Sequence, residues 1–526
     1  MTIAFTAGSV HPTMTATMTA HVRHLQTLIT SFHPLIVVDT VEEERVETLL
    51  QLATQEMSLP LMEWSLAQGL TRSTASADHR WQNDCATPGM TQVNYDETQA
   101  PLEVLRKIRE LNLKAMFWLK DFAVHLDDAT VAREFRELVQ GFSESRSALV
   151  ITGDGIQLPH VIGQDAVYLD LKLPGREELT HVVQATMRSL RAKNRIQIEI
   201  QDSELSQLVQ ALSGMTLKQA RQVVAYAAMD DGKLAIDDIP SILKRKAQVI
   251  REDSVLEFFP VDDSPLQLGG FTGLKQWLAR AQVGFTPQAQ ALNLKPPKGI
   301  LIVGIQGCGK SLSVKAIAKA WKMPLLKLEA GKIYDKYVGE SERNFRKALN
   351  LAESMSPAIL WIDEIEKAFG QSESDADGGL SRRLFGAFLT WMQEKSQSVF
   401  VIATANDLSR IPPELLRKGR FDEIFFVDLP DAQERSSIWQ LHLAQRRQNP
   451  ANVDLAQLVQ ATEGYSGAEI EQATIAGLYT ALYQQQPLST DLLLHEIRST
   501  VPLSVSRRED VEHLRSIAKE RFVSVR

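Results

Sequence analysis

One segment constrains the fold of this chain more than any other. Residues 304–311 read GIQGCGKS, between the apolar run GILIVG (299–304) and the helix-like stretch SLSVKAIAKAW (311–321). A strand, a glycine-rich loop and a helix in this order are typical of a phosphate-binding loop, or P-loop. The glycines let backbone N–H groups surround a phosphate, and the helix N-terminus adds positive potential. The segment therefore predicts a parallel α/β domain that binds a nucleotide.

Two side chains of this loop have distinct predicted roles. Lys310 is expected to reach the β- and γ-phosphates of ATP, and Ser311 is expected to bind Mg²⁺. The other loop positions expected to contact the nucleotide are Gly304, Gly307, Cys308, Gly309 and Leu312. A helix N-terminus lowers a thiol pKa, so Cys308 could act as a redox switch; we favour a tolerated small residue.

Further polar residues follow two later apolar runs. AILWIDE (358–364) ends in two acids, of which Asp363 is expected to hold Mg²⁺ and Glu364 to polarise the attacking water. VFVIATAN (399–406) places Asn406 at a strand end, where its amide can orient that water. Arg417 and Arg420 flank a glycine. They are either solvated surface charges or arginine fingers that stabilise developing phosphate charge.

Composition excludes several classes of protein. The 526 residues include 57 Lys and Arg against 65 Asp and Glu, a net charge of −8, so no global field attracts nucleic acid or anionic lipid. Two cysteines make neither a disulfide framework nor a zinc site and indicate a reducing compartment. No apolar run approaches the length of a membrane span. We expect a cytoplasmic protein without a membrane span, for which nucleic acid is an unlikely partner.

The motifs together resemble the AAA family of ATPases. Leu268-Gly269-Gly270, the P-loop, Asp363-Glu364, Asn406 and PELLRKGRFDEIFFVDLPD (413–431) occur in the order of that family, and GYSGAEIEQA (464–473) is similar to its helical lid. The resemblance implies Mg-ATP hydrolysis in a homo-oligomeric ring, usually a hexamer, with Arg417 and Arg420 acting on a neighbour's ATP. It also implies that Gly269, Gly270, Gly467 and Ala468 lie near the adenine.

A second loop resembles the pore loop of the protein-remodelling branch of that family. Tyr337, Val338 and Gly339 form its aromatic–hydrophobic–glycine sequence. In a ring, an aromatic side chain facing the channel can grip an extended polypeptide without reading its sequence. The alternative is a tyrosine packed inside its own domain.

The N-terminal half is expected to be an inactive copy of the same fold. LVQALSGMTLKQA (208–220) aligns with LVQATEGYSGAEI (458–470), and FWLKDF (117–122) aligns with LWIDEI (360–365). After the first strand, LIVVD (35–39), the turn contains Glu42, Glu43 and Glu44, whose charges would repel phosphate. We expect no ATP hydrolysis there.

The expected fold class is therefore α/β, with a P-loop AAA core of parallel strands and a helical lid, preceded by a degenerate AAA-like α/β domain. The expected boundaries are a disordered tail at 1–30, the degenerate domain at 31–245, a linker at 246–267, the ATPase core at 268–431, and the lid with C-terminal helices at 432–526.

Nearly the whole chain resembles the AAA group encoded in red-algal plastid and cyanobacterial genomes, through EEER (42–45), WLKDF (118–122) and PLSVSRREDVEHLRSIAKER (502–521). This resemblance implies a phototroph, and the plastid stroma if the gene is in a plastid. We expect a ring ATPase that remodels an unknown protein substrate. The alternative is an ATP-gated assembly switch that binds partners through its N-terminal domain without threading them.

Overall fold

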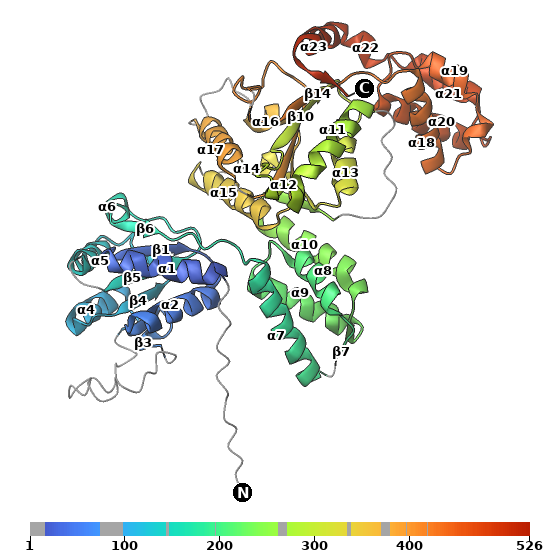
Figure 1. Ribbon diagram of the computed structural model, residues 1–526. Helices are drawn as coiled ribbons and strands as arrows, with labels where there is room; N and C mark the ends of the chain where they lie inside the picture. The colour runs from blue at the N-terminus through green and yellow to red at the C-terminus, as the bar shows by residue number, and fades with distance from the viewer. Residues whose placement is uncertain are drawn as a thin grey trace. The chain divides into compact units, whose positions relative to one another are not determined.

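The computed structural model describes residues 16–73, 98–143, 147–194, 196–260, 271–333, 338–369, 379–395, 397–417 and 419–525. The chain forms two compact units (Figure 1). Unit 1 comprises residues 1–209 and 215–234, and unit 2 comprises residues 210–214 and 235–526. In the described part of the chain, no helix is long and apolar enough to cross a membrane.

Unit 1 is built on a sheet with the strand order β3-β2-β4-β5-β1-β6. Its strands are β1 (Leu35–Asp39), β2 (Leu61–Ser65), β3 (Gly69–Arg72), β4 (Met116–Lys120), β5 (Ala148–Gly153) and β6 (Ala166–Tyr168). All neighbours pair in parallel except β2 and β3, which pair antiparallel. The apolar runs of the sequence predict β1, β4, β5 and β6. They do not predict the short hairpin of β2 and β3, in which polar residues interrupt the apolar ones.

Helices cover both faces of this sheet. One face packs on α1 (Ala16–Thr30) and α2 (Glu43–Met57), and the other packs on α4 (Pro101–Leu111) and α5 (Ala129–Phe142). The expectation of a disordered tail up to residue 30 is therefore wrong for α1. The apolar side chains of α1 recur at helical spacing, and Val22, Leu25 and Ile29 are almost fully buried against the sheet.

Unit 2 contains a second sheet, with the order β15-β14-β10-β13-β12-β11-β9. Its strands are β9 (Leu256–Phe259), β10 (Gly299–Gly304), β11 (Leu325–Leu328), β12 (Ala358–Ile362), β13 (Val399–Ala405), β14 (Glu423–Val427) and β15 (Val523–Ser524). Only β9 runs antiparallel among the described strands of this sheet. α11 (Thr272–Gln282) and α13 (Lys310–Trp321) pack on one face, where α13 buries Val314 and Ile317.

The segment expected to be a linker at 246–267 is partly ordered, so that expectation is wrong for its first half. α10 (Ile239–Asp253) continues through residue 246, and β9 pairs with β11 at the sheet edge. In LEFF, at 256–259, Leu256 and Phe258 are the buried, alternating positions of this edge strand. The domain boundary expected at 245 lies inside α10.

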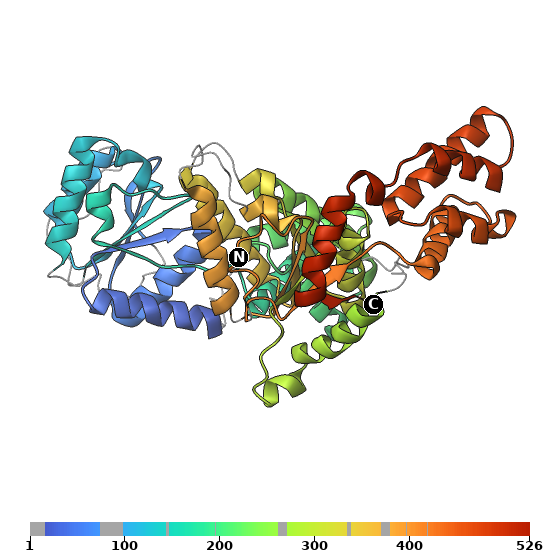
Figure 2. The ribbon, with the colours of Figure 1, turned by 90° about the horizontal axis from the view of Figure 1, so that it is seen from above.

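A cluster of helices follows β14. It comprises α18 (Ala432–Gln445), α19 (Leu455–Ala461), α20 (Gly467–Tyr483) and α21 (Thr490–Ser499), which share a core around Trp439 and Leu458. Figure 2 shows these helices, in orange and red, beside the sheet rather than on its faces. The chain then returns to the sheet through α22 (Leu503–Ser506), α23 (Arg508–Arg521) and β15.

The two sheets share one topology. Read from the edge, β6-β1-β5-β4-β2 and β14-β10-β13-β12-β11 have the same sequence order of parallel strands. The helices repeat as well: Thr216 caps α9 (Leu217–Asp230) through a capping box with Gln219, and Ser466 caps α20 through one with Glu469. The predicted fold class, an α/β ATPase core with a lid preceded by a related α/β domain, is confirmed.

Candidate nucleotide site

The P-loop of unit 2 lies between the end of β10 and the start of α13. Gly307 and Gly309 have φ of 78° and 86°, left-handed values that favour glycine. Lys310 is buried, and its ammonium donates to the carbonyls of Gly304 at 2.8 Å and Ile305 at 2.9 Å. Burial lowers the pKa of Lys310 to about 8, against the opposing effect of nearby acidic groups. The lysine is therefore charged at neutral pH.

The two predicted acids lie beside this loop. Asp363 accepts from the Ser311 hydroxyl at 3.4 Å, which brings the two expected Mg²⁺ ligands together. Glu364, two residues after the end of β12 (Ala358–Ile362), has φ of 49° and accepts through Oε1 from the Asn406 amide at 2.8 Å. The second oxygen of Glu364 pairs with Lys367 at 2.6 Å. The structure thus brings the predicted residues Lys310 and Ser311 close to the pair formed by Glu364 and Asn406.

Two other residues of this cluster escaped the sequence analysis. Thr404, inside β13, donates to Asp363 Oδ1 at 2.6 Å and accepts from the backbone N–H of Glu364 at 3.1 Å. Lys327, on β11, lies 3.8 Å from the other oxygen of Asp363 and over the ring of Trp361. A threonine within an apolar run and a lysine in a strand carry no motif, so only the pairing of the strands reveals their role.

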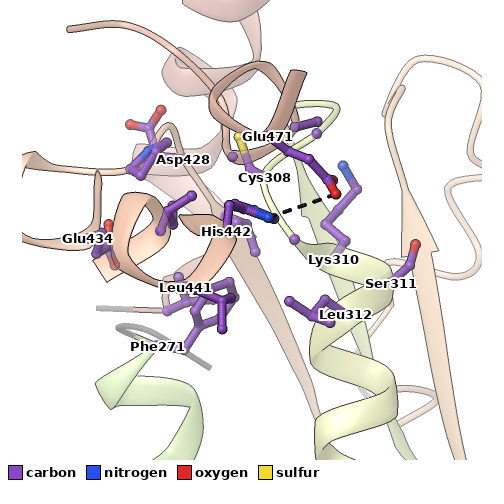
Figure 3. A pocket seen from close by; sticks show the side chains of 18 of the residues that line it. Phe271, Cys308, Lys310, Ser311, Leu312, Asp428, Glu434, Leu441, His442 and Glu471 are labelled. Atoms are coloured by element: carbon purple, nitrogen blue, oxygen red, sulfur yellow. Dashed lines mark ion pairs between the residues drawn. The ribbon is translucent and has the colours of Figure 1, made fainter. Parts of the chain in front are cut away.

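A cavity of about 490 Å³ opens beside the P-loop (Figure 3). Residues 307–312 line one side, and the lid contributes Gly467 and Ala468, whose N–H donates to the Gly307 carbonyl at 3.0 Å. Cys308 and Leu312 also line it, as expected. The same cavity contains residues that the sequence analysis missed: Phe271, Asp428, Leu441, His442, Glu471 and Val525.

His442 and Glu471 face each other across the lid side of this cavity (Figure 3). His442 Nδ1 lies 3.8 Å from Glu471 Oε1, and Arg446 donates to the same oxygen at 2.8 Å. Burial lowers the pKa of His442, and Glu471 only partly opposes this. His442 is therefore neutral at physiological pH and offers an uncharged ring to the cavity.

The remaining predicted residues lie elsewhere. Arg417 is exposed and Arg420 is half-buried, and neither lines the cavity of its own chain. Gly269, Gly270 and Tyr337 lie outside the described residues. Val338 and Gly339 are the first residues of α15 (Val338–Ser354), so this part of the expected pore loop is helical.

Unit 1 offers an internal comparison. Leu35 pairs with Leu149 and Leu149 with Phe117, as Gly299 pairs with Val401 and Val401 with Leu360. This register places Lys120 at the position of Asp363, Asp121 at that of Glu364, Thr152 at that of Thr404, and Glu63 at that of Lys327. Asp121, with φ of 52°, even keeps the left-handed backbone of Glu364.

The charges at two of these positions are exchanged. In unit 2, a lysine on β11 lies 3.8 Å from the acid after β12, Asp363. In unit 1, an acid on β2, Glu63, lies 3.4 Å from the lysine that ends β4, Lys120. Both lysines lie over a tryptophan ring: Lys120 is 4.0 Å from the ring centre of Trp118 on its own strand, and Lys327 is 4.9 Å from that of Trp361 on the neighbouring strand. Unit 1 therefore has an ammonium where unit 2 has the expected metal ligand.

The loop of unit 1 is also shorter and filled by its own side chains. It has only residues 40–42 between β1 and α2, whereas residues 305–309 separate β10 from α13. Arg45 is buried and donates to Glu178 at 3.0 and 2.9 Å, and Glu42 accepts from the Leu217 N–H at 2.8 Å. Burial raises the pKa of Glu42 despite these contacts.

Comparisons with known proteins agree with this geometry. The ATPase family associated with various cellular activities (AAA) matches residues 300–429, which contain the P-loop and both acids. A protein of Pyropia yezoensis, the "uncharacterized AAA domain-containing protein ycf46", is 34% identical over 94% of this chain and 96% of its own. The chain belongs to the AAA family of ATPases, in its ycf46 group. It is therefore an ATPase, as the sequence predicts.

The AAA comparisons extend to both units. The N-terminal domain and the second domain of SpoVK-like AAA ATPases match residues 21–171 and 177–253. A ycf46 protein of Guillardia theta is 33% identical over 94% of both chains. The proteasome-activating nucleotidase of Thermococcus gammatolerans is 30% identical over 47% of this chain and 64% of its own.

Proposed function

We propose that unit 2 hydrolyses Mg-ATP and that a homo-oligomeric ring, a hexamer, uses this reaction to remodel a protein partner. The observation that carries the catalytic part is the joint position of Lys310, Ser311, Asp363, Glu364 and Asn406 at one end of the sheet. Each of these side chains has a bonding partner that fixes it within the cluster.

The roles follow from the chemistry of each group. The Lys310 ammonium neutralises phosphate charge, and the P-loop N–H groups orient the phosphates. Glu364 accepts the proton of the attacking water, while the Asn406 amide fixes the carboxylate that does so. Ser311 and Asp363 supply hard oxygen donors 3.4 Å apart, a pair that fits Mg²⁺. The metal would neutralise developing charge on the phosphates.

The ring is supported by what the site lacks within one chain. Neither Arg417 nor Arg420 lines the described cavity, although both lie in the segment between β13 and β14, the two strands that pair with β10. A neighbouring copy can present them to the γ-phosphate, where a planar guanidinium stabilises the charge of the transition state. A finger donated by the next copy implies a head-to-tail contact between subunits, and such a contact forms a closed ring when its rotation closes.

The remodelling role rests on Tyr337 and on the relatives. One similar protein is a proteasome-activating nucleotidase, and another, from Archaeoglobus fulgidus, is a cell division cycle protein 48 homolog, 27% identical over 58% of this chain and 44% of its own. We propose a protein substrate rather than nucleic acid, in the cytoplasm, or in the stroma if the gene is in a plastid. Nucleic-acid binding that weakens steeply with salt would contradict this.

The catalytic proposal is tested with two variants. Lys310→Ala removes the charge that holds phosphate, so ATP binding is lost. Glu364→Gln keeps the shape but cannot accept a proton, so ATP binds and turnover falls by at least about 100-fold. Titration with a fluorescent ATP analogue and a phosphate-release assay separate the two. Equal loss of ATP binding in both variants would contradict these roles.

An ATP-gated switch remains the second candidate, because unit 1 has the form of an ATPase domain whose site is filled by its own ion pairs. Glu364→Gln, held with ATP, is the bait for identifying the partner by pull-down. Tyr337→Ala then decides between the candidates. If the oligomer remodels its partner, Tyr337→Ala loses both partner unfolding and partner-stimulated hydrolysis. Tyr337→Phe should retain both, because the face of the aromatic side chain makes the contact. Intact remodelling in Tyr337→Ala would favour the switch.

A further inference from the structure

The last part of the described chain returns from the lid to the nucleotide site. We call residues 503–525 the C-terminal strap; it comprises α22, α23 and β15. β15 adds to the edge of the sheet in parallel with β14, with Phe425 opposite Val523 and Phe426 opposite Ser524. Figure 1 shows α23 beside the end of the sheet that carries β14. The strap, which follows the lid in the sequence, therefore completes the edge of the core sheet.

One strap residue reaches the nucleotide cavity itself. Val525 is 3% exposed, packs in the same apolar cluster as Phe271 and Val427, and lines the cavity with them. Its N–H donates to the Phe426 carbonyl at 3.3 Å, and its carbonyl accepts from the Gly273 N–H at 2.9 Å. Val525 thus joins the edge strand to the start of α11.

These bonds place Val525 at the end of the cavity away from the phosphates. Gly273 follows Phe271 by two residues, whereas the phosphate end is formed by the P-loop and Lys310. Phe271, Leu441 and Val525 give this end an apolar wall. An apolar wall suits the faces of a purine ring, because it gains contact area without requiring charge.

The strap is anchored to both parts of the site. Arg515 holds the carboxylate of Asp428, another cavity residue, with bonds of 2.8 to 3.0 Å to both oxygens. The Leu503 N–H donates to Glu469 at 2.7 Å, and Glu469 forms the capping box that starts the lid helix facing Gly307. The strap therefore touches the core and the lid on either side of the cavity.

We infer that the C-terminal strap is part of the ATP site, with Val525 binding the base and Arg515 positioning the wall that carries Asp428. This inference rests on the ATP site proposed above. It predicts that changes in the strap weaken binding of the nucleoside part of ATP and spare binding of its phosphates.

The test uses the full chain and two probes, ATP and inorganic triphosphate. Val525→Ala removes apolar surface at the base end, so the Kd for ATP rises about tenfold while the Kd for triphosphate is unchanged. Val523→Ala is the matched control, because Val523 has the same side chain two residues earlier and is 44% exposed. If Val525→Ala does not fold, Val525→Thr replaces it, because threonine keeps the volume of valine. It should raise the Kd for ATP relative to the Kd for triphosphate in the same direction.

Arg515→Gln tests the anchor, with the exposed Arg508→Gln on the same helix as its control. The KM for ATP rises in Arg515→Gln while kcat at saturating ATP stays near that of Arg508→Gln. An ATP Kd equal in Val525→Ala and Val523→Ala would overturn the inference, as would equal weakening of ATP and triphosphate. Lys310→Ala separates failure of this inference from failure of the proposed ATP site. If Lys310→Ala still binds ATP, the proposed ATP site itself is wrong.

Discussion

The hydroxyl of Thr404 connects the two acids of the site, because it donates to Asp363 and accepts from the N–H of Glu364. Thr404→Val keeps the shape of the side chain but removes both bonds. We expect kcat to fall about 10- to 100-fold, the usual effect of losing a residue that orients a metal ligand, with the Kd for ATP little changed. Thr404→Ser should restore turnover. Unchanged kcat in Thr404→Val would show that the strand alone positions both acids.

Lys310 gives the site a pH dependence. Its pKa of about 8 lies well below the ordinary 10.5, so the free site loses its positive charge as the pH rises through 8. Bound phosphate favours the charged form, so ATP affinity should fall by up to about tenfold per pH unit above that point. Titrations with ATP between about pH 7 and about pH 9.5 measure this, since phosphate groups with a pKa near ~6 are already deprotonated. Lys310→Arg stays charged and should show a flat profile; a flat wild-type profile would contradict the assignment.

At the scale of elements, helix α10 has a buried lysine, Lys246, where it packs against strand β9. Lys246 donates to the Ala211 carbonyl at 3.0 Å and lies 4.9 Å from the ring centre of Phe258, on β9. Burial lowers the pKa of Lys246 to about 7 from 10.5. The unfolded chain therefore binds more protons between these values, and this residue makes the protein more stable as the pH rises through that window.

Lys246→Met should remove this contribution. Relative to the variant, the wild type is expected to gain about 2 kcal/mol of unfolding free energy between about pH 7 and about pH 9. Urea unfolding at several pH values measures the difference. Lys244→Met, on the exposed side of the same helix, is the control and should follow the wild type. Parallel pH profiles for wild type and Lys246→Met would mean that Lys246 keeps an ordinary pKa.

Elements also show where sequence reasoning succeeds. Continuous apolar runs such as GILIVG identify buried parallel strands, and the P-loop fixes the end of the sheet at which the site forms. Helix α1 and strand β15 were not predicted because their folding depends on distant partners: α1 packs on a sheet formed later in the chain, and β15 pairs with a strand almost a hundred residues before it. Thr404 and Val525 escaped for the same reason.

At the scale of the whole molecule, the two related domains should not both bind nucleotide. In unit 1, Lys120 stands at the metal-ligand position and Arg45 is already paired with Glu178. Isothermal titration with Mg-ATP should therefore give one site per chain, and Lys310→Ala should give none. Residual stoichiometric binding in Lys310→Ala would place a nucleotide in unit 1.

The ring proposal predicts complementation between subunits. Arg417→Ala lacks a finger and Glu364→Gln lacks a base, so each alone should hydrolyse ATP poorly. In mixed rings, some interfaces combine an intact finger with an intact base, and part of the activity should return. Hydrolysis measured across mixing ratios tests this. A mixture of Glu364→Gln and Lys310→Ala is the control: both changes disable the ATP-binding side of a subunit, so mixing them creates no interface with an intact site. No recovery between subunits shown to exchange would count against fingers acting in trans.

The exchanged charges of the two units limit how unit 1 could be given a metal site. To place an acid at the metal position of unit 1, Lys120 would have to become acidic, but Glu63 would then face a second carboxylate. Changing Glu63 to lysine first would instead set two ammonium groups side by side. Either single step places like charges in contact, which destabilises neighbouring strands. Converting this pair of unit 1 to the charges of unit 2 without placing like charges in contact therefore requires Lys120 and Glu63 to be exchanged together.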